Sequence, residues 1–308
     1  MLKHRLISFV VLLSLFCTIV FVENFYVSTF AAAILALPMS YFAVYEFLNM
    51  TENIGYGGFK KIGGWLAVIF TLCYIVKYGL VSNIPVPYPI FAVFFWFMIL
   101  KNISDKDKLK RVLMTAVAFF MIMAPLSFVI EFLFQISQLI DVKGNLEFVR
   151  SPFSKMVLLY IILVTKAGDT GAYCTGMICN KLNGGKNHPV VPKVSPKKSI
   201  EGVIGGIFLS VVVSYLFLMD YNIKMIILGG DSKILVVILP LFYGVLLYFG
   251  GFFGDLVESS LKRTCGVKDS GNILPGMGGV LDVVDSLLVA VPVFILVRLL
   301  INNVIKLF

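Results

Sequence analysis

Acidic residues gather in one polar segment, residues 254–286, between two apolar runs near the C-terminus. Asp255 ends the first run, and Asp282 and Asp285 begin the second. A spacing of three residues puts the latter two carboxylates on one helix face, where like charges repel unless a cation lies between them. Proteins commonly hold Mg²⁺ with one or two carboxylates plus substrate phosphates. We therefore predict that these three carboxylates bind Mg²⁺, and a second cation is left open.

Basic residues and glycines in the same segment favour a ligand that carries phosphate. The basic residues are Lys262, Arg263 and Lys268, and the glycines are Gly276, Gly278 and Gly279. Glycine lets the backbone approach a ligand closely, and free N–H groups at a helix start attract phosphate. A helix-breaking loop would explain the glycines alone, but not the acids and bases beside them.

A second polar segment, residues 167–206, has a similar character. Asp169 lies inside an apolar run, where a carboxylate is costly unless it binds a cation or pairs with a base. Three lysines follow in a loop that contains several prolines: Lys193, Lys197 and Lys198. Lysines on a short, rigid loop suit phosphate oxygens, although the lysines alone would also fit a basic cytoplasmic loop.

The elements that must position these segments are membrane helices. The chain has 308 residues, of which 59% are hydrophobic and 14% charged, with a mean hydropathy of +0.96. Soluble domains carry about 25% charged residues, and a membrane span needs roughly 20 residues. The apolar runs are 6–22, 26–49, 62–83, 88–100, 112–136, 154–180, 202–219, 234–253 and 280–301. They predict an all-α, polytopic transmembrane bundle of about nine spans.

The distribution of charge predicts the orientation of this bundle. With the N-terminus in the cytoplasm, most of the 26 lysines and arginines fall in cytoplasmic segments, as the positive-inside rule requires. Both polar segments then face the cytoplasm. The net charge of +9 therefore reflects topology and phosphate binding, and we expect no nucleic-acid partner.

The N-terminal half, residues 1–150, shows no chemistry, whereas residues 151–308 form the predicted catalytic region. Glu46, Lys77 and Glu131 lie inside apolar runs, and interhelical pairing or snorkelling explains them better than a function does. The five cysteines show no CxxC spacing and the chain has two histidines. This argues against a disulfide framework, a zinc site and a catalytic triad that needs histidine.

The segment 254–286 resembles the signature of the phosphatidate cytidylyltransferases, the CDP-diacylglycerol synthases. That signature reads Ser-x-apolar-Lys-Arg, four residues, Lys-Asp, then Pro-Gly-His-Gly-Gly and Asp-Arg-x-Asp. The matching positions are Ser259, Leu261, Lys262, Arg263, Lys268, Asp269, Pro275, Gly276, Met277, Gly278, Gly279, Asp282, Val283 and Asp285. The stretches DTGAY (169–173) and PKVSPKKSIEG (192–202) also look like the family's second block, so the resemblance covers residues 165–290.

The resemblance implies transfer of a cytidylyl group from CTP to phosphatidate in phospholipid biosynthesis, with release of pyrophosphate. Catalytic roles would fall on Asp255, Asp282, Asp285, Lys262, Arg263 and Lys268. Substrate binding would fall on Asp169, Lys193, Ser195, Lys197, Lys198, Ser259, Asp269, Gly276, Gly278 and Gly279. The site would face the cytoplasm from a bacterial cytoplasmic membrane, and a homodimer is left open.

Two positions depart from the family pattern, because Met277 stands where the family has His and Val283 where it has Arg. Methionine donates no strong hydrogen bond, and valine removes a guanidinium. Loss of a donor to the transition state costs about 10²–10³-fold in rate. A catalytically weakened member, or a scaffold that binds nucleotide without turnover, therefore stays open.

Two further functions are weighed against this one. A related CTP-dependent transferase could use another lipid acceptor, such as an archaeol-type lipid or a polyprenol. An ion-coupled transporter is less well supported, because transporters often carry broken helices at corresponding positions of two repeats. Here the polar segments cluster in the C-terminal half.

Overall fold

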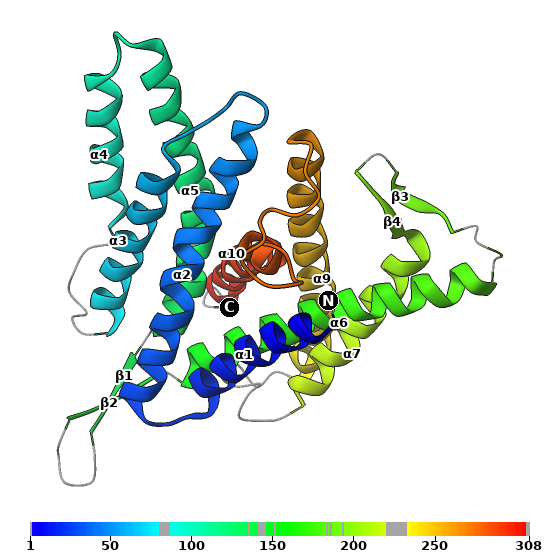
Figure 1. Ribbon diagram of the computed structural model, residues 1–308. Coiled ribbons are helices and arrows are strands. Elements are labelled where there is room, and N and C mark those ends of the chain that lie inside the picture. Colours follow the sequence, from blue (N-terminus) through cyan, green and yellow to red (C-terminus); the bar gives the residue numbers. More distant parts are fainter. Residues whose placement is uncertain are drawn as a thin grey trace. The chain divides into compact units, whose positions relative to one another are not determined.

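The computed structural model describes residues 2–79, 87–134, 136–140, 146–150, 152–182, 184, 187–192, 194–219 and 233–305 (Figure 1). The helices of these residues are α1 (Leu2–Phe21), α2 (Phe25–Glu52), α3 (Lys60–Gly79), α4 (Tyr88–Lys101), α5 (Lys106–Phe134), α6 (Pro152–Leu182), α7 (Ile200–Phe217), α9 (Lys233–Thr264) and α10 (Val280–Ile305). The strands are β1 (Ile136–Ile140), β2 (Leu146–Arg150), β3 (Pro189–Val191) and β4 (Ser195–Ser199). They form two antiparallel hairpins, β1–β2 and β3–β4.

Polar residues mark where several helices begin. The side chain of Asn24 accepts a hydrogen bond from the Val27 N–H at the start of α2 (3.1 Å), and Asp105 does the same for Lys108 at the start of α5 (3.0 Å). Ser199 ends β4 and accepts from the Gly202 N–H at the start of α7 (3.1 Å). Such caps satisfy N–H groups that have no partner inside the helix.

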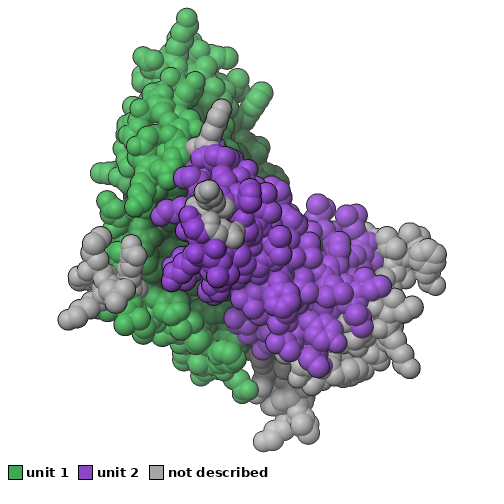
Figure 2. All heavy atoms as spheres, turned by 90° about the vertical axis from the view of Figure 1, so that its right-hand side faces the viewer, with its two compact units in different colours: residues 1–155, 262–284 green, residues 156–261, 285–308 purple. Residues whose placement is uncertain are grey.

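The chain divides into two compact units, coloured separately in Figure 2. Unit 1 holds Met1–Lys155 and Lys262–Val284, and unit 2 holds Met156–Leu261 and Asp285–Phe308. Helices α9 and α10 therefore contribute to both units. The division near residue 150 stays a prediction, and in the structure the stretch Lys262–Val284 groups with Met1–Lys155.

Aromatic side chains fill the core of unit 1, where α2, α3 and α5 pack against one another and α4 packs on α5 (Figure 1). Phe70 and Phe119 are fully buried. Their rings meet edge to face at 5.4 Å, and Phe91 stacks on Phe119 at 5.1 Å. Aromatic pairs in these geometries contribute about 0.5–1.5 kcal/mol beyond the area that they bury.

Small residues bring helices α6 and α7 of unit 2 close together. A Cβ on Gly171 would lie 2.6 Å from the Gly205 carbonyl oxygen, and one on Gly202 would lie 2.9 Å from the Ala172 carbonyl oxygen. The Ser210 hydroxyl donates across the same interface to the Val164 carbonyl (3.0 Å). Small residues and short interhelical hydrogen bonds are typical of helix packing in membranes.

The predicted membrane-spanning, all-helical fold class is confirmed in outline. Six helices of the described chain, α2, α5, α6, α7, α9 and α10, are long and apolar enough to cross a membrane, so the protein is polytopic. The first and fourth predicted spans correspond to shorter apolar helices, Leu6–Phe21 and Tyr88–Lys101. The third predicted span matches α3, and its last residues, 80–83, lie outside the described chain. The two hairpins were not predicted, and the count of nine spans stays a prediction.

Replacing Gly171 by alanine tests the close packing of α6 and α7. The added Cβ meets a backbone oxygen that cannot move aside, and overpacking costs about 1–3 kcal/mol. We expect Gly171→Ala to lower the thermal unfolding midpoint of the detergent-solubilised protein. Gly176→Ala in the same helix is the matched control, because its Cβ would find the nearest heavy atom, Ser199 Oγ, at 3.5 Å. Equal midpoints for the two variants would contradict the packing described.

Candidate functional site

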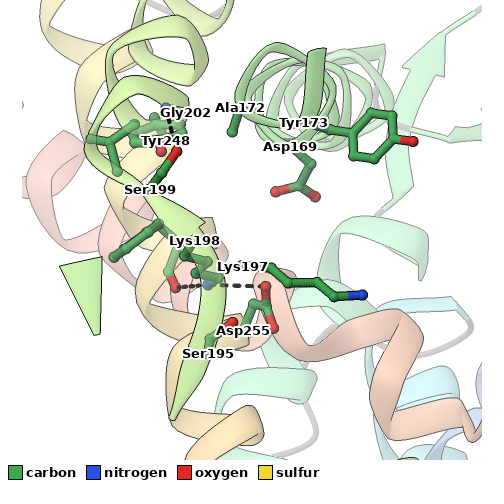
Figure 3. A pocket seen from close by; sticks show the side chains of 12 residues that line it. Asp169, Ala172, Tyr173, Ser195, Lys197, Lys198, Ser199, Gly202, Tyr248 and Asp255 are labelled. Carbon is green, nitrogen blue, oxygen red and sulfur yellow. Dashed lines mark hydrogen bonds and ion pairs between the residues drawn. The ribbon is translucent and has the colours of Figure 1, made fainter. Parts of the chain in front are cut away.

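A cavity of about 310 Å³ opens in unit 2 among α6, β4, α7 and α9 (Figure 3). Its polar lining residues are Asp169, Tyr173, Ser195, Lys197, Lys198, Ser199, Tyr248 and Asp255. In Figure 3, Asp169 points from α6 toward the space beside the strand that carries the two lysines. The structure thus brings together residues from both polar segments of the sequence.

The hairpin β3–β4 and the cap of α7 fix the position of the lysines. Strand β4 ends at Ser199, whose hydroxyl caps the N-terminus of α7. Helix α7 therefore begins two residues after Lys198. Lys198 Nζ lies 3.0 Å from Asp255 Oδ2, donates to the Phe252 carbonyl (3.2 Å) and sits over the Phe252 ring (4.3 Å). Lysine pairs with phosphate as a flexible point charge. Lys197 and Lys198 are therefore suited to hold an anionic ligand beside Asp255.

Asp255 also belongs to a group of three carboxylates, here named the acidic cluster: Asp255 and Glu258 of α9, and Asp285 of α10. One oxygen from each lies within 4.8 Å of the other two. Glu258 is 6% exposed and Asp285 is 9% exposed. Charged groups so close and so poorly hydrated repel one another strongly unless a cation or protons compensate them. This cluster could hold a metal ion, and its all-oxygen donor set fits Mg²⁺.

Backbone packing allows the acidic cluster to form. The side chains of Asp255 and Glu258 share a face of α9 because they are three residues apart. A Cβ on Gly254 would collide with the Asp285 carbonyl oxygen, so glycine is needed for α10 to approach α9 here. The Ser259 hydroxyl donates to Asp255 Oδ1 (3.0 Å) and orients that carboxylate.

Asp169 pairs with a neighbour in its own helix. Lys166 Nζ lies 3.0 Å from Asp169 Oδ2 and also donates to the Ser286 hydroxyl (3.0 Å). From its position in an apolar run, Asp169 is expected either to join a metal site or to pair with a lysine. The structure gives it a lysine partner at the edge of the cavity.

Eight further predicted residues lie in unit 1, in or beside the signature loop, residues 265–279, which joins α9 to α10. Lys262 Nζ lies 2.7 Å from Asp282 Oδ1. Oδ2 of the same carboxylate accepts hydrogen bonds from the Gly279 N–H (2.7 Å) and the Ser270 N–H (2.9 Å). Gly276 and Gly278 have φ values of +78° and +98°, which other residues rarely adopt. Arg263, Lys268 and Asp269 are exposed.

The predicted residues are thus distributed over two groups. Unit 2 holds Asp169, Ser195, Lys197, Lys198, Asp255, Ser259 and Asp285. Unit 1 holds Lys262, Arg263, Lys268, Asp269, Gly276, Gly278, Gly279 and Asp282. Lys193 lies outside the described residues. Two of the three predicted metal ligands, Asp255 and Asp285, meet in the acidic cluster, while a metal-binding role for Asp282 stays a prediction.

Glu258 was not among the predicted site residues. Its signal in the sequence is the spacing of three residues from Asp255, the same spacing that drew attention to Asp282 and Asp285. An acid one helical turn from a candidate metal ligand, at the edge of an apolar run, is itself a candidate metal ligand.

Comparison with known proteins identifies the family of this chain. A sequence profile described as the Cytidylyltransferase family matches residues 3–301. A phosphatidate cytidylyltransferase of Staphylococcus aureus strain COL is 44% identical over 137 residues, which is 44% of this chain and 46% of the relative. One from Haemophilus influenzae is 41% identical over 138 residues, 45% of this chain and 44% of the relative.

A third relative carries no assigned activity. The uncharacterised protein YnbB of Escherichia coli strain K12 is 37% identical over 139 residues, 45% of this chain and 41% of the relative. The matches therefore span less than half the length of these curated relatives, whereas the family profile spans almost the whole chain. This chain belongs to the cytidylyltransferase family.

Proposed function

We propose that this protein transfers a cytidylyl group from CTP to phosphatidate, forming CDP-diacylglycerol and pyrophosphate. The observation that carries the proposal is the place of Asp255, which belongs both to the acidic cluster and to the lining of the lysine-bearing cavity. A cation site beside an anion site is what a nucleoside triphosphate requires. We propose phosphatidate as the acceptor because two relatives are named phosphatidate cytidylyltransferase.

In the proposed reaction, a phosphate oxygen of phosphatidate attacks the α-phosphorus of CTP. A new P–O bond forms while the bond to the β-phosphate oxygen breaks, and pyrophosphate leaves. The acceptor brings its own nucleophile, so the protein needs to position and stabilise charge rather than supply a nucleophile. Mg²⁺, when bound, would neutralise negative charge on the triphosphate.

Residues of unit 2 would position the substrates and stabilise their charge. Asp255, Glu258 and Asp285 would hold the cation, and Ser259 would keep Asp255 oriented through its hydrogen bond. Lys197 and Lys198 would bind phosphate oxygens in the cavity. For Lys198 this means exchanging its contact with Asp255 for a substrate phosphate when the cation occupies the acidic cluster.

The membrane setting fits a lipid acceptor. Helices α6, α7, α9 and α10 are all long and apolar enough to cross a bilayer, and they carry the cavity and the acidic cluster. We propose a bacterial cytoplasmic membrane, with the site on the cytoplasmic side where CTP is available.

The direct test is turnover by the purified protein in detergent with CTP, phosphatidate and Mg²⁺. We expect pyrophosphate and CDP-diacylglycerol in equal amounts. Asp285→Asn should lower kcat by at least about 100-fold, since even residues behind metal ligands cost 10–100-fold. Asp105→Asn, an exposed acid paired with Lys108, is the matched control and should retain activity.

The lipid acceptor is tested in the same assay. Met277 and Val283, which replace the family's histidine and arginine, are the reason to include an archaeol-type phospholipid and a polyprenyl phosphate in the panel. Turnover with one of these and none with phosphatidate would replace the proposed acceptor. Nucleotide binding without any product would contradict the enzymatic proposal altogether.

A second prediction concerns Glu258. If its carboxylate helps to bind the cation, Glu258→Gln should raise the Mg²⁺ concentration for half-maximal activity by about tenfold or more. Glu52→Gln, which alters an exposed acid of unit 1, should leave that concentration unchanged. An unaltered Mg²⁺ dependence in Glu258→Gln would remove this residue from the cation site.

A further inference from the structure

Glu46 is a buried carboxylate of α2 whose partners all come from the signature loop and the start of α10. The residue is 2% exposed. Its Oε1 accepts a hydrogen bond from the Val280 N–H (3.1 Å), and its Oε2 accepts from the Leu281 N–H (2.9 Å) and the Ser270 hydroxyl (3.0 Å). A buried carboxylate is very costly without such bonds, and bonds to a charged acceptor are the strong ones. The carboxylate therefore ties α2 to the first turn of α10.

The glycines of the loop are shaped around this carboxylate. A Cβ on Gly279 would collide with the Ser270 hydroxyl and with Glu46, and a Cβ on Gly271 would collide with Glu46 as well. Glycines in this loop are expected to let the backbone approach a ligand. For Gly271 and Gly279, the group that the backbone approaches in the structure is the side chain of Glu46.

The N–H groups at the N-terminus of α10 donate to carboxylates of the protein itself. The first N–H groups of a helix have no partner inside it and attract anions. Here the Gly279 N–H donates to Asp282, while the next two N–H groups donate to Glu46. The Ser270 hydroxyl lies 3.0 Å from Glu46 Oε2 and 2.9 Å from Asp282 Oδ2, which links the two carboxylates. Asp282 in turn holds Lys262.

We infer that Glu46 is a positioning residue that fixes the signature loop and, through Ser270 and the first turn of α10, the side chains of Asp282 and Lys262. Its carboxylate bonds to the loop and to the first turn of α10, so it would act through these two residues. The N-terminal half of the chain thereby contributes to the chemistry, although its sequence shows none. The catalytic part of this inference rests on the proposed function and on the catalytic roles that the family resemblance implies for Asp282 and Lys262, whereas the structural part does not.

The experiment compares Glu46→Gln with Glu52→Gln, which removes an exposed charge from the end of the same helix. Hydrogen–deuterium exchange is measured on the folded, monodisperse protein in detergent, and turnover is measured on the same samples. We expect faster exchange over residues 270–284 in Glu46→Gln, and unchanged exchange over β3–β4. We also expect kcat to fall about 10–100-fold while KM for CTP changes little, because a small misplacement of positioned groups costs up to 10²-fold.

The conservative change Glu46→Asp keeps the charge and shortens the side chain. It should recover part of the lost kcat, which a purely structural role in packing would not predict. If the Glu46→Gln protein is not recovered folded, Ser270→Ala removes the hydroxyl that joins Glu46 to Asp282, and it should give the same two changes more weakly.

Unchanged exchange over residues 270–284 would overturn the inference. Faster exchange with normal kcat per folded molecule would show a structural contact only and would overturn the positioning role. If the unaltered protein turns over no CTP, the proposed function fails, and the exchange rates still decide whether Glu46 fixes the loop.

Discussion

Repulsion among three carboxylates is the constraint that the candidate site in unit 2 must satisfy. Asp255, Glu258 and Asp285 place oxygens within 4.8 Å of one another, on helices whose other residues are largely apolar. Glu258 and Asp285 are buried, so water screens their charges poorly, and the cluster needs compensation by positive charge or by protons. Lys198 supplies some positive charge at Asp255, Lys166 acts on Asp285, and a divalent cation could add to both. A lysine-bearing cavity adjoins the cluster at Asp255, and Gly254 lets α9 and α10 approach closely enough for the cluster to form.

In unit 1, two acids beside the signature loop are stabilised by backbone N–H groups. Asp282 and Glu46 are both largely withdrawn from water, but each receives backbone N–H groups from the start of α10 or the loop before it. Helix N-termini carry partial positive charge, which stabilises both acids. The charges are thus balanced within the polypeptide, and the loop is held by groups that are far apart in sequence.

Features that depend on local sequence patterns could be predicted from the sequence. Long apolar runs located the helices, and the spacing of polar residues located Asp255, Asp285 and the lysines of the cavity. The sequence marks Glu46 as a carboxylate inside an apolar run, but it does not reveal the partners of Glu46, because these lie 224–235 residues away and leave no periodic signal. The hairpin β3–β4 was missed because Ser195–Ser199 reads SPKKS, which has little of the β-branched and aromatic character of typical strands. Glu258 was missed although its spacing from Asp255 was visible.

The claim that the acidic cluster binds a divalent cation is tested most directly by metal binding itself. Mn²⁺ can stand in for Mg²⁺, and its electron paramagnetic resonance signal separates bound from free ion in detergent solution without turnover. The account predicts a saturable site on the folded protein that is lost in the double variant Asp255→Asn, Asp285→Asn and kept in Asp105→Asn. Equal Mn²⁺ binding by all three proteins would contradict it, and the acidic cluster would then need another source of positive charge.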